Sequence, residues 1–117
     1  MTNKLIYLFI LLFFIGCEFK QKEISGEKLY IENNCITCHS IDGSIMLGPT
    51  LKGIFGKAVE LSNGDKIIAD EKYLYESIVN PSKDIVKNYP DIMTPYKKLL
   101  SDDEINALIK YIKSLKP

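Results

Sequence analysis

Two cysteines and a histidine in the segment Cys35-Ile36-Thr37-Cys38-His39 constrain this chain more than any other feature. Two thiols three positions apart can each add across a vinyl group of haem, and the histidine that follows can coordinate the iron. His39 is the only histidine in the 117 residues, which excludes sites that need two imidazoles, such as a binuclear copper centre or a conventional zinc finger. The segment therefore predicts one covalently attached haem c, with Cys35 and Cys38 as attachment sites and His39 as an axial ligand.

Three other interpretations of this segment fit the rest of the chain less well. A thioredoxin-like dithiol would need a strand–helix unit, whereas here a predicted helix precedes the segment and a loop follows it. A zinc ion would find only two thiols and the adjacent imidazole, and adjacent residues close poorly on one tetrahedron. A structural disulfide between Cys35 and Cys38 would leave His39 without a role.

An iron held by His39 has a sixth position, which Met, Lys or Tyr could fill or which could stay open. Downstream of the motif the chain has two methionines, Met46 and Met93. Met46 lies two residues before Gly48-Pro49, which we expect on the histidine side of the ring. Met93 lies in the segment Tyr89–Tyr96, whose two prolines restrict the loop and so can hold a thioether against iron. We therefore predict Met93 as the second axial ligand and Met46 as a packing residue.

The N-terminus carries a separate signal. Lys4 precedes the unbroken apolar run Leu5–Ile15, which is too short for the roughly 20 residues of a membrane-spanning helix but fits the core of a secretory signal peptide. The segment Phe14–Cys17 resembles a bacterial lipobox, whose cysteine becomes the lipid-modified first residue of the mature protein. We predict a lipoprotein signal peptide over residues 1–16 and lipidation of Cys17. Ordinary signal cleavage and a short buried helix are the alternatives.

The remainder divides into a tether and one domain. Residues 17–24 begin at the predicted lipid site and continue as a polar stretch without periodicity, which indicates a tether, and residues 25–117 form the domain. Only 41 of the last 100 residues are apolar, a lean core for a domain of this size. A bound haem would complete that core, so we expect the haem-free chain to fold poorly.

Capping residues mark three helices in this domain. Ser25 can begin a helix over residues 26–34, and Asp70 can begin a second helix that Pro81 stops. A capping box that starts at Ser101 begins the third. The apolar residues of the third helix recur at helical spacing: Ile105, Leu108, Ile109, Ile112 and Leu115.

The dipeptide Asn63-Gly64 predicts a tight hairpin turn, flanked by strands over residues 59–61 and 66–68. A two-stranded ribbon is marginal alone and must lean on the helices. The predicted fold class is therefore all-α, with one small β-hairpin inserted between helices.

Together these features resemble the class I c-type cytochromes across residues 25–117. More narrowly, the chain is similar to the cytochrome c domain fused to subunit II of some haem-copper cytochrome c oxidases. The segments that carry the resemblance are Cys35–His39, Gly48–Gly56, Asn63-Gly64, Asp70, Tyr89-Pro90 and Met93–Tyr96. Because the ligands of the oxidase copper centre are missing, the resemblance implies the cytochrome module alone, as a stand-alone bacterial lipoprotein.

The resemblance also implies roles for residues around the haem. Pro49 would accept a hydrogen bond from the ring of His39 and so fix its tautomer. Tyr30 would pack with Tyr111 where the terminal helices cross, and Tyr89 is a candidate partner for a haem propionate. The residues placed around the haem in this way are Tyr30, Pro49, Leu51, Tyr89 and Tyr111.

The function implied is that of a membrane-tethered one-electron carrier in a respiratory chain, not an enzyme. It would exchange electrons with complexes of the cytochrome c oxidase or quinol:cytochrome c reductase type, and it would deliver them to a terminal oxidase. It would be exported and lipid-anchored on the periplasmic or extracytoplasmic side of a bacterial membrane. Zero net charge argues against a nucleic-acid partner.

Three alternatives remain open: the haem subunit of a dehydrogenase complex, a haem-based redox or gas sensor, and a small peroxidase. Four lysines flank the predicted Met93 ligand, and they either steer acidic partners or form a solvated face. They are Lys83, Lys87, Lys97 and Lys98.

Overall fold

Polar caps begin the three α-helices of the computed structural model, which describes Gly16 and residues 21–117. The helices are α2 (Gly26–Glu32), α3 (Glu71–Val79) and α4 (Asp102–Ser114). Ser25 accepts a hydrogen bond from the Lys28 amide, Asp70 accepts one from the Tyr73 amide, and α4 begins with the predicted capping box. The three predicted helices are therefore present.

The first helix ends two residues earlier than predicted. Asn33 caps α2, and Asn34 takes a left-handed conformation with φ of 60° that turns the chain into the short 3₁₀ helix η2 (Cys35–Thr37). Asparagine tolerates this region better than most residues. A second 3₁₀ turn, η3 (Pro81–Lys83), follows α3. The early end of α2 places the cysteine motif on a tight turn of its own.

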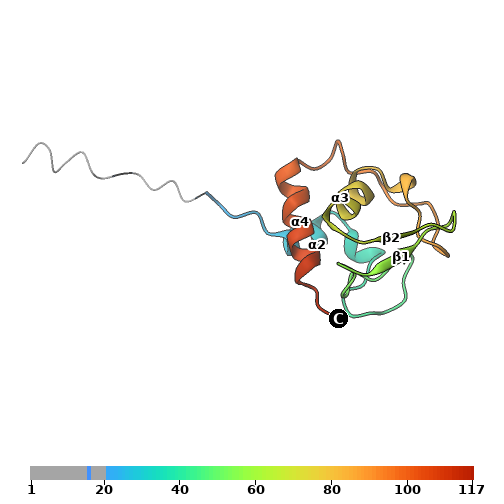
Figure 1. Ribbon diagram of the computed structural model, residues 1–117. Helices are drawn as coiled ribbons and strands as arrows, with labels where there is room; N and C mark the ends of the chain where they lie inside the picture. The colour runs from blue at the N-terminus through green and yellow to red at the C-terminus, as the bar shows by residue number, and fades with distance from the viewer. Residues whose placement is uncertain (1–15, 17–20) are drawn as a thin grey trace, which may run out of the picture.

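The helices α2 and α4 cross closely (Figure 1). A Cβ atom at Gly26 would overlap the carbonyl oxygen of Ala107, so glycine is needed for this approach. Beside the crossing, the rings of Tyr30 and Tyr111 pack with centroids 5.7 Å apart. The α3 helix also packs against α4, and the buried core lies between them.

The hairpin consists of β1 (Ala58–Glu60) and β2 (Lys66–Ile68), paired antiparallel. Gly64 has φ of 91°, which glycine adopts without strain, and it closes the turn by donating to the carbonyl of Leu61. The first strand lies one residue earlier than predicted, because Leu61 leaves β1 and forms a bridge with Val86. The all-α description holds for the framework only, since the hairpin and long loops complete the domain.

Most of the predicted leader and the lipid site at Cys17 lie outside the described residues. Within the described part of the chain, no helix combines the length and apolar character that crossing a bilayer requires.

Candidate haem site

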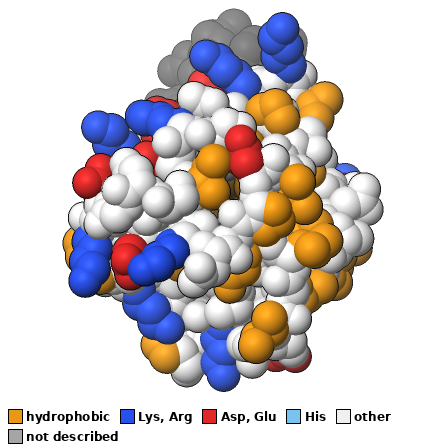
Figure 2. All heavy atoms as spheres, turned by 90° about the vertical axis from the view of Figure 1, so that its right-hand side faces the viewer, with side chains coloured by type: hydrophobic (Ala, Val, Ile, Leu, Met, Phe, Trp, Pro, Cys, Tyr) orange, Lys and Arg blue, Asp and Glu red, His pale blue; other side chains and the backbone are white. Residues whose placement is uncertain are grey.

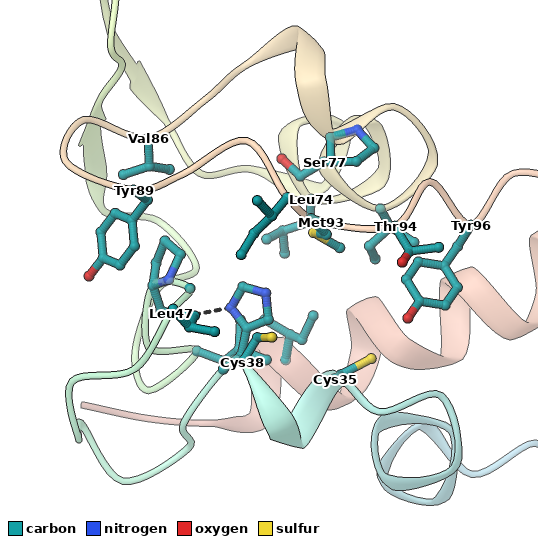
Figure 3. Close-up of a pocket in the computed structure, with 18 of the residues that line it drawn as sticks. Cys35, Cys38, Leu47, Leu74, Ser77, Val86, Tyr89, Met93, Thr94 and Tyr96 are labelled. Carbon is teal, nitrogen blue, oxygen red and sulfur yellow. Dashed lines mark hydrogen bonds between the residues drawn. The ribbon is translucent and has the colours of Figure 1, made fainter.

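A cavity of about 320 Å³ lies between α3, the cysteine turn and the loops that follow each of them. This volume falls within the roughly 300–1,000 Å³ of typical cofactor sites. Figure 3 shows Cys35 and Cys38 at one side of the cavity, with Leu74, Ser77 and Met93 on the other. The predicted site residues that line it are Tyr30, Cys35, Cys38, His39, Pro49, Leu51, Tyr89 and Met93. Tyr111 does not line the cavity and packs behind Tyr30 instead.

The cysteine turn holds both thiols and the imidazole on one short piece of backbone. The amides of Cys38 and His39 both donate to the carbonyl of Cys35, at 3.2 and 2.9 Å, and Thr37 donates its hydroxyl to the carbonyl of Asn34. The two thiols are free. Among the described residues, no group of three or more His, Cys, Asp or Glu side chains is placed to hold a metal ion. The structure therefore gives no support to the disulfide or the zinc interpretation.

The ring of His39 is fixed from several sides. Its Nδ1 lies 2.7 Å from the carbonyl oxygen of Pro49, the hydrogen bond drawn as a dashed line in Figure 3. Because a carbonyl only accepts, Nδ1 carries the proton, which leaves the Nε2 lone pair free for a metal. Tyr30 donates its hydroxyl to the carbonyl of His39. These are the contacts that an axial imidazole requires.

Gly48 allows the imidazole to occupy this position. A Cβ atom there would lie 2.7 Å from Nδ1 of His39 and would overlap Cε1. Gly48 has no positive φ, so the requirement is for space rather than for backbone conformation. The sequence offered one signal for this role, a glycine directly before Pro49 in a segment without a predicted turn.

Met93 reaches the cavity from a loop 54 residues after His39 in the chain. The two ends of this loop are hydrogen-bonded: Ser62 donates to the carbonyl of Ile85, and Tyr96 donates its hydroxyl to the carbonyl of Asn33 at 2.7 Å. Met46 does not line the cavity and lies in a separate shallow groove. The arrangement thus favours Met93 over Met46 as the thioether that meets the iron.

Burial raises the pKa of several groups around the cavity, among them Cys35, Tyr30 and Tyr96. Desolvation is the main cause for the Cys35 thiol and for the phenols of Tyr30 and Tyr96. The two tyrosine hydroxyls therefore stay neutral and act as hydrogen-bond donors at neutral pH.

Ser77 is the second residue that the sequence did not single out. In the described part of the chain, the Ser77 hydroxyl is the one buried side-chain polar group that has no hydrogen-bond partner. A serine in a helix can bond to the carbonyl four residues earlier, but Ser77 does not. It lines the cavity one helical turn after Tyr73. The sequence feature that could have identified it is a polar residue on an otherwise apolar face of this helix. An unpartnered hydroxyl facing the cavity suits a bound group with polar atoms at its edge.

The residues present fit a haem c. The cavity is lined mainly by apolar side chains and offers two free thiols, an imidazole with its Nε2 available, and a thioether from the opposite side. These are the donors that covalent attachment and His/Met ligation need.

A model of the family described as "Cytochrome c" matches residues 24–116 of the chain. The chain belongs to the cytochrome c family. It is 28% identical to a protein named cytochrome c from Tetrahymena pyriformis, over 80% of this chain and 89% of that protein. It is 29% identical to a cytochrome c2 from Rhodospirillum rubrum, over 79% of this chain and 96% of that protein. Membership of the cytochrome c family implies covalently bound haem c, typically one per chain.

Proposed function

We propose that this cytochrome c is a monohaem electron carrier in which Cys35 and Cys38 form the thioether links. His39 and Met93 are the axial ligands. The observation that carries the proposal is the single cavity into which the cysteine turn and the distant Met93 loop both project. Bound haem supplies the one-electron chemistry, because its iron exists in ferric and ferrous forms.

The protein side chains set the conditions for that exchange. Pro49 holds the imidazole of His39 in one orientation, with Nε2 directed to the position of the iron. The apolar walls exclude water and so favour the ferrous haem, which carries less charge than the ferric haem. This effect and a Met ligand both raise the reduction potential. With His39 and Met93 holding the iron in both oxidation states, little reorganisation would accompany electron transfer.

We further propose that the carrier works at a membrane surface outside the cytoplasm. The basic, apolar leader supports export, and Cys17 supports a lipid anchor. Residues 21–24 are exposed and belong to no helix or strand, which suits a tether. The partners are redox complexes of the oxidase or quinol:cytochrome c reductase type, with a terminal oxidase as the acceptor, in the manner of the cytochrome c module of the oxidase-fused domains.

Partner contact on this molecule relies on apolar surface more than on lysine charge. Figure 2 views the side of the hairpin and the loop after α3, and hydrophobic side chains gather on much of this face. Ile45 and Leu47 are 95% and 58% exposed, and they line a groove next to the haem cavity. Two of the four lysines form ion pairs, Lys83 with Glu76 and Lys87 with Glu60, so their charge is partly cancelled.

A redox titration of the purified holoprotein tests the proposal. We expect a single one-electron transition and no binding of CO by the ferrous protein. In membranes, we expect respiratory donors to reduce the haem, and we expect it to stay reduced for longer when an oxidase inhibitor is present. Ready CO binding, or turnover of peroxide at enzyme rates, would instead support a sensor or a peroxidase. Co-purification with a dehydrogenase as its stoichiometric subunit would support the third alternative.

A further inference from the structure

The inserted hairpin is hydrogen-bonded to the loop that carries Met93. Leu61 forms an antiparallel bridge with Val86. The Ser62 amide donates to the carbonyl of Ile85 at 2.8 Å, and the Lys87 amide donates to the carbonyl of Glu60 at 3.0 Å. Residues 85–87 therefore pair with the chain at the end of β1 through an isolated antiparallel bridge.

Beyond this bridge the loop has little support of its own. The Tyr89 amide bonds back to Val86, but residues 90–95 form no backbone hydrogen bond with any described residue. One exposed side-chain bond supports them: the Ser82 hydroxyl donates to Asp91 Oδ1 at 2.8 Å. Regular pairing resumes only at Tyr96, whose amide donates to the carbonyl of Ile78 at 3.0 Å. Met93 is thus held between two anchors, and one of them is the hairpin.

The backbone bridge outweighs the ion pair beside it. Lys87 Nζ lies 2.8 Å from Glu60 Oε1, but these side chains are 52% and 41% exposed. Exposed pairs contribute little and are screened by salt. Leu61, in contrast, is only 4% exposed, so the bridge has one end in the core.

We propose that the hairpin is a positioning element for the axial methionine. By fixing residues 85–87 it limits how far Met93 can move from the iron, and its loosening lets an external ligand replace the thioether. This inference rests on the proposed ligation by Met93. It assigns a role to the Ser62 amide, the Leu61–Val86 bridge and the Lys87–Glu60 pair.

Ser62→Pro removes one hydrogen bond of the bridge with little other change. The turn that starts at Leu61 is type I, because the Gly64 amide bonds back to Leu61 and neither Ser62 nor Asn63 has a positive φ. Proline is favoured at the second position of such a turn, but it lacks the amide that bonds to Ile85. Ser62→Ala keeps the amide and is the matched control.

Imidazole binding to the ferric holoprotein measures how easily Met93 leaves the iron. We expect Ser62→Pro to bind imidazole about three- to tenfold more tightly than the unchanged protein, the range that one backbone hydrogen bond supports, and Ser62→Ala to bind it equally. Equal affinity in all three proteins would overturn the inference. A ferric wild-type spectrum without the sulfur-to-iron band would overturn Met93 ligation itself, which separates the two failures.

A second pair of variants serves if Ser62→Pro yields no holoprotein. Lys87→Gln removes the ion pair on an exposed side chain, whereas Lys97→Gln removes a charge that forms no ion pair with any described residue. We expect about twofold tighter imidazole binding for Lys87→Gln only, and we expect this difference to vanish at high salt. Identical affinities for the two variants at low salt would overturn the inference.

Discussion

The two sides of the haem cavity are built in different ways. On the His39 side, the backbone from Cys38 to Leu51 is cross-linked: Gly48 donates to the carbonyl of Cys38 and Leu51 to that of Ser40, both at 2.8 Å. On the Met93 side, residues 90–95 form no backbone hydrogen bond with the described residues, and between the two ends of this segment Asp91 accepts a hydrogen bond from the exposed Ser82 hydroxyl at 2.8 Å. His39 is therefore fixed by its own segment, whereas Met93 depends on anchors farther along the chain.

This difference suits an electron carrier with a covalently attached cofactor. The cysteine turn and the imidazole form one rigid unit, so the cofactor keeps its place even when the other ligand is strained. The methionine side can vary without loss of the cofactor. We therefore expect changes on the first side to affect haem retention and folding, and changes on the second side to affect ligation.

The double variant Cys35→Ala/Cys38→Ala should have the largest effect. It removes covalent attachment, and the lean core then lacks its central apolar body, so we expect loss of most helical circular dichroism at 25 °C. Cys17→Ser is the control, because it removes the predicted lipid site and leaves both thioethers. A double variant that stays compact without haem would contradict the role of haem in folding.

Gly48→Ala adds one methyl group next to His39 and so disturbs the rigid side of the cavity. The added Cβ would overlap the imidazole of His39, and overpacking of this kind costs about 1–3 kcal/mol. We expect the free energy of unfolding of the holoprotein in urea to fall by that amount and the reduction potential to shift. Ile45→Ala, at a nearby residue that is 95% exposed and does not line the cavity, should do neither. If Gly48→Ala matches the unchanged protein in both measurements, the ring of His39 is not held as described.

Tyr96→Phe loosens the second anchor of the methionine side. The lost hydrogen bond to Asn33 should lower the free energy of unfolding by about 1 kcal/mol at neutral pH. Burial raises the pKa of Tyr96, so its stabilising contribution is complete below its unfolded pKa of about 10 and is lost as pH rises through the folded value. Urea titrations at increasing pH should therefore show the two proteins converging above pH 10. A constant gap would contradict this role.

Salt should have the smallest effect. Since Lys83 and Lys87 are ion-paired, we expect electron transfer to an isolated oxidase to change less than about threefold between low and physiological ionic strength. Stopped-flow oxidation of the reduced protein measures this rate. A steep fall with salt would show that lysine charge directs docking after all.

The sequence predicted the framework well because its signals were local. Ser25, Asp70 and the Ser101 capping box each act within four residues, and the Asn63-Gly64 turn does the same. The shifted first strand shows where this fails. Leu61 stays bonded across the turn to Asp65 and also bridges Val86, a partner 25 positions away that no local pattern could specify.

For the haem site, too, local features could be predicted from the sequence and long-range contacts could not. The cysteine turn could be identified from five adjacent residues. Gly48, Ser77 and Tyr96 act through contacts with segments far along the chain or with the cavity itself, and the local signals at Gly48 and Ser77 did not specify which groups they would contact. Met93 was predicted because two prolines marked its loop and because Met46 lay next to a segment expected on the histidine side. Its anchoring by the hairpin became apparent only in three dimensions.

The absorption spectrum of the ferric protein shows directly whether Met93 coordinates the iron. We expect a sulfur-to-iron charge-transfer band that Met93→Ala abolishes and that Met46→Ala, which alters a groove outside the cavity, leaves intact. Loss of the band in Met46→Ala, or its absence from the unchanged protein, would contradict a haem held between His39 and Met93.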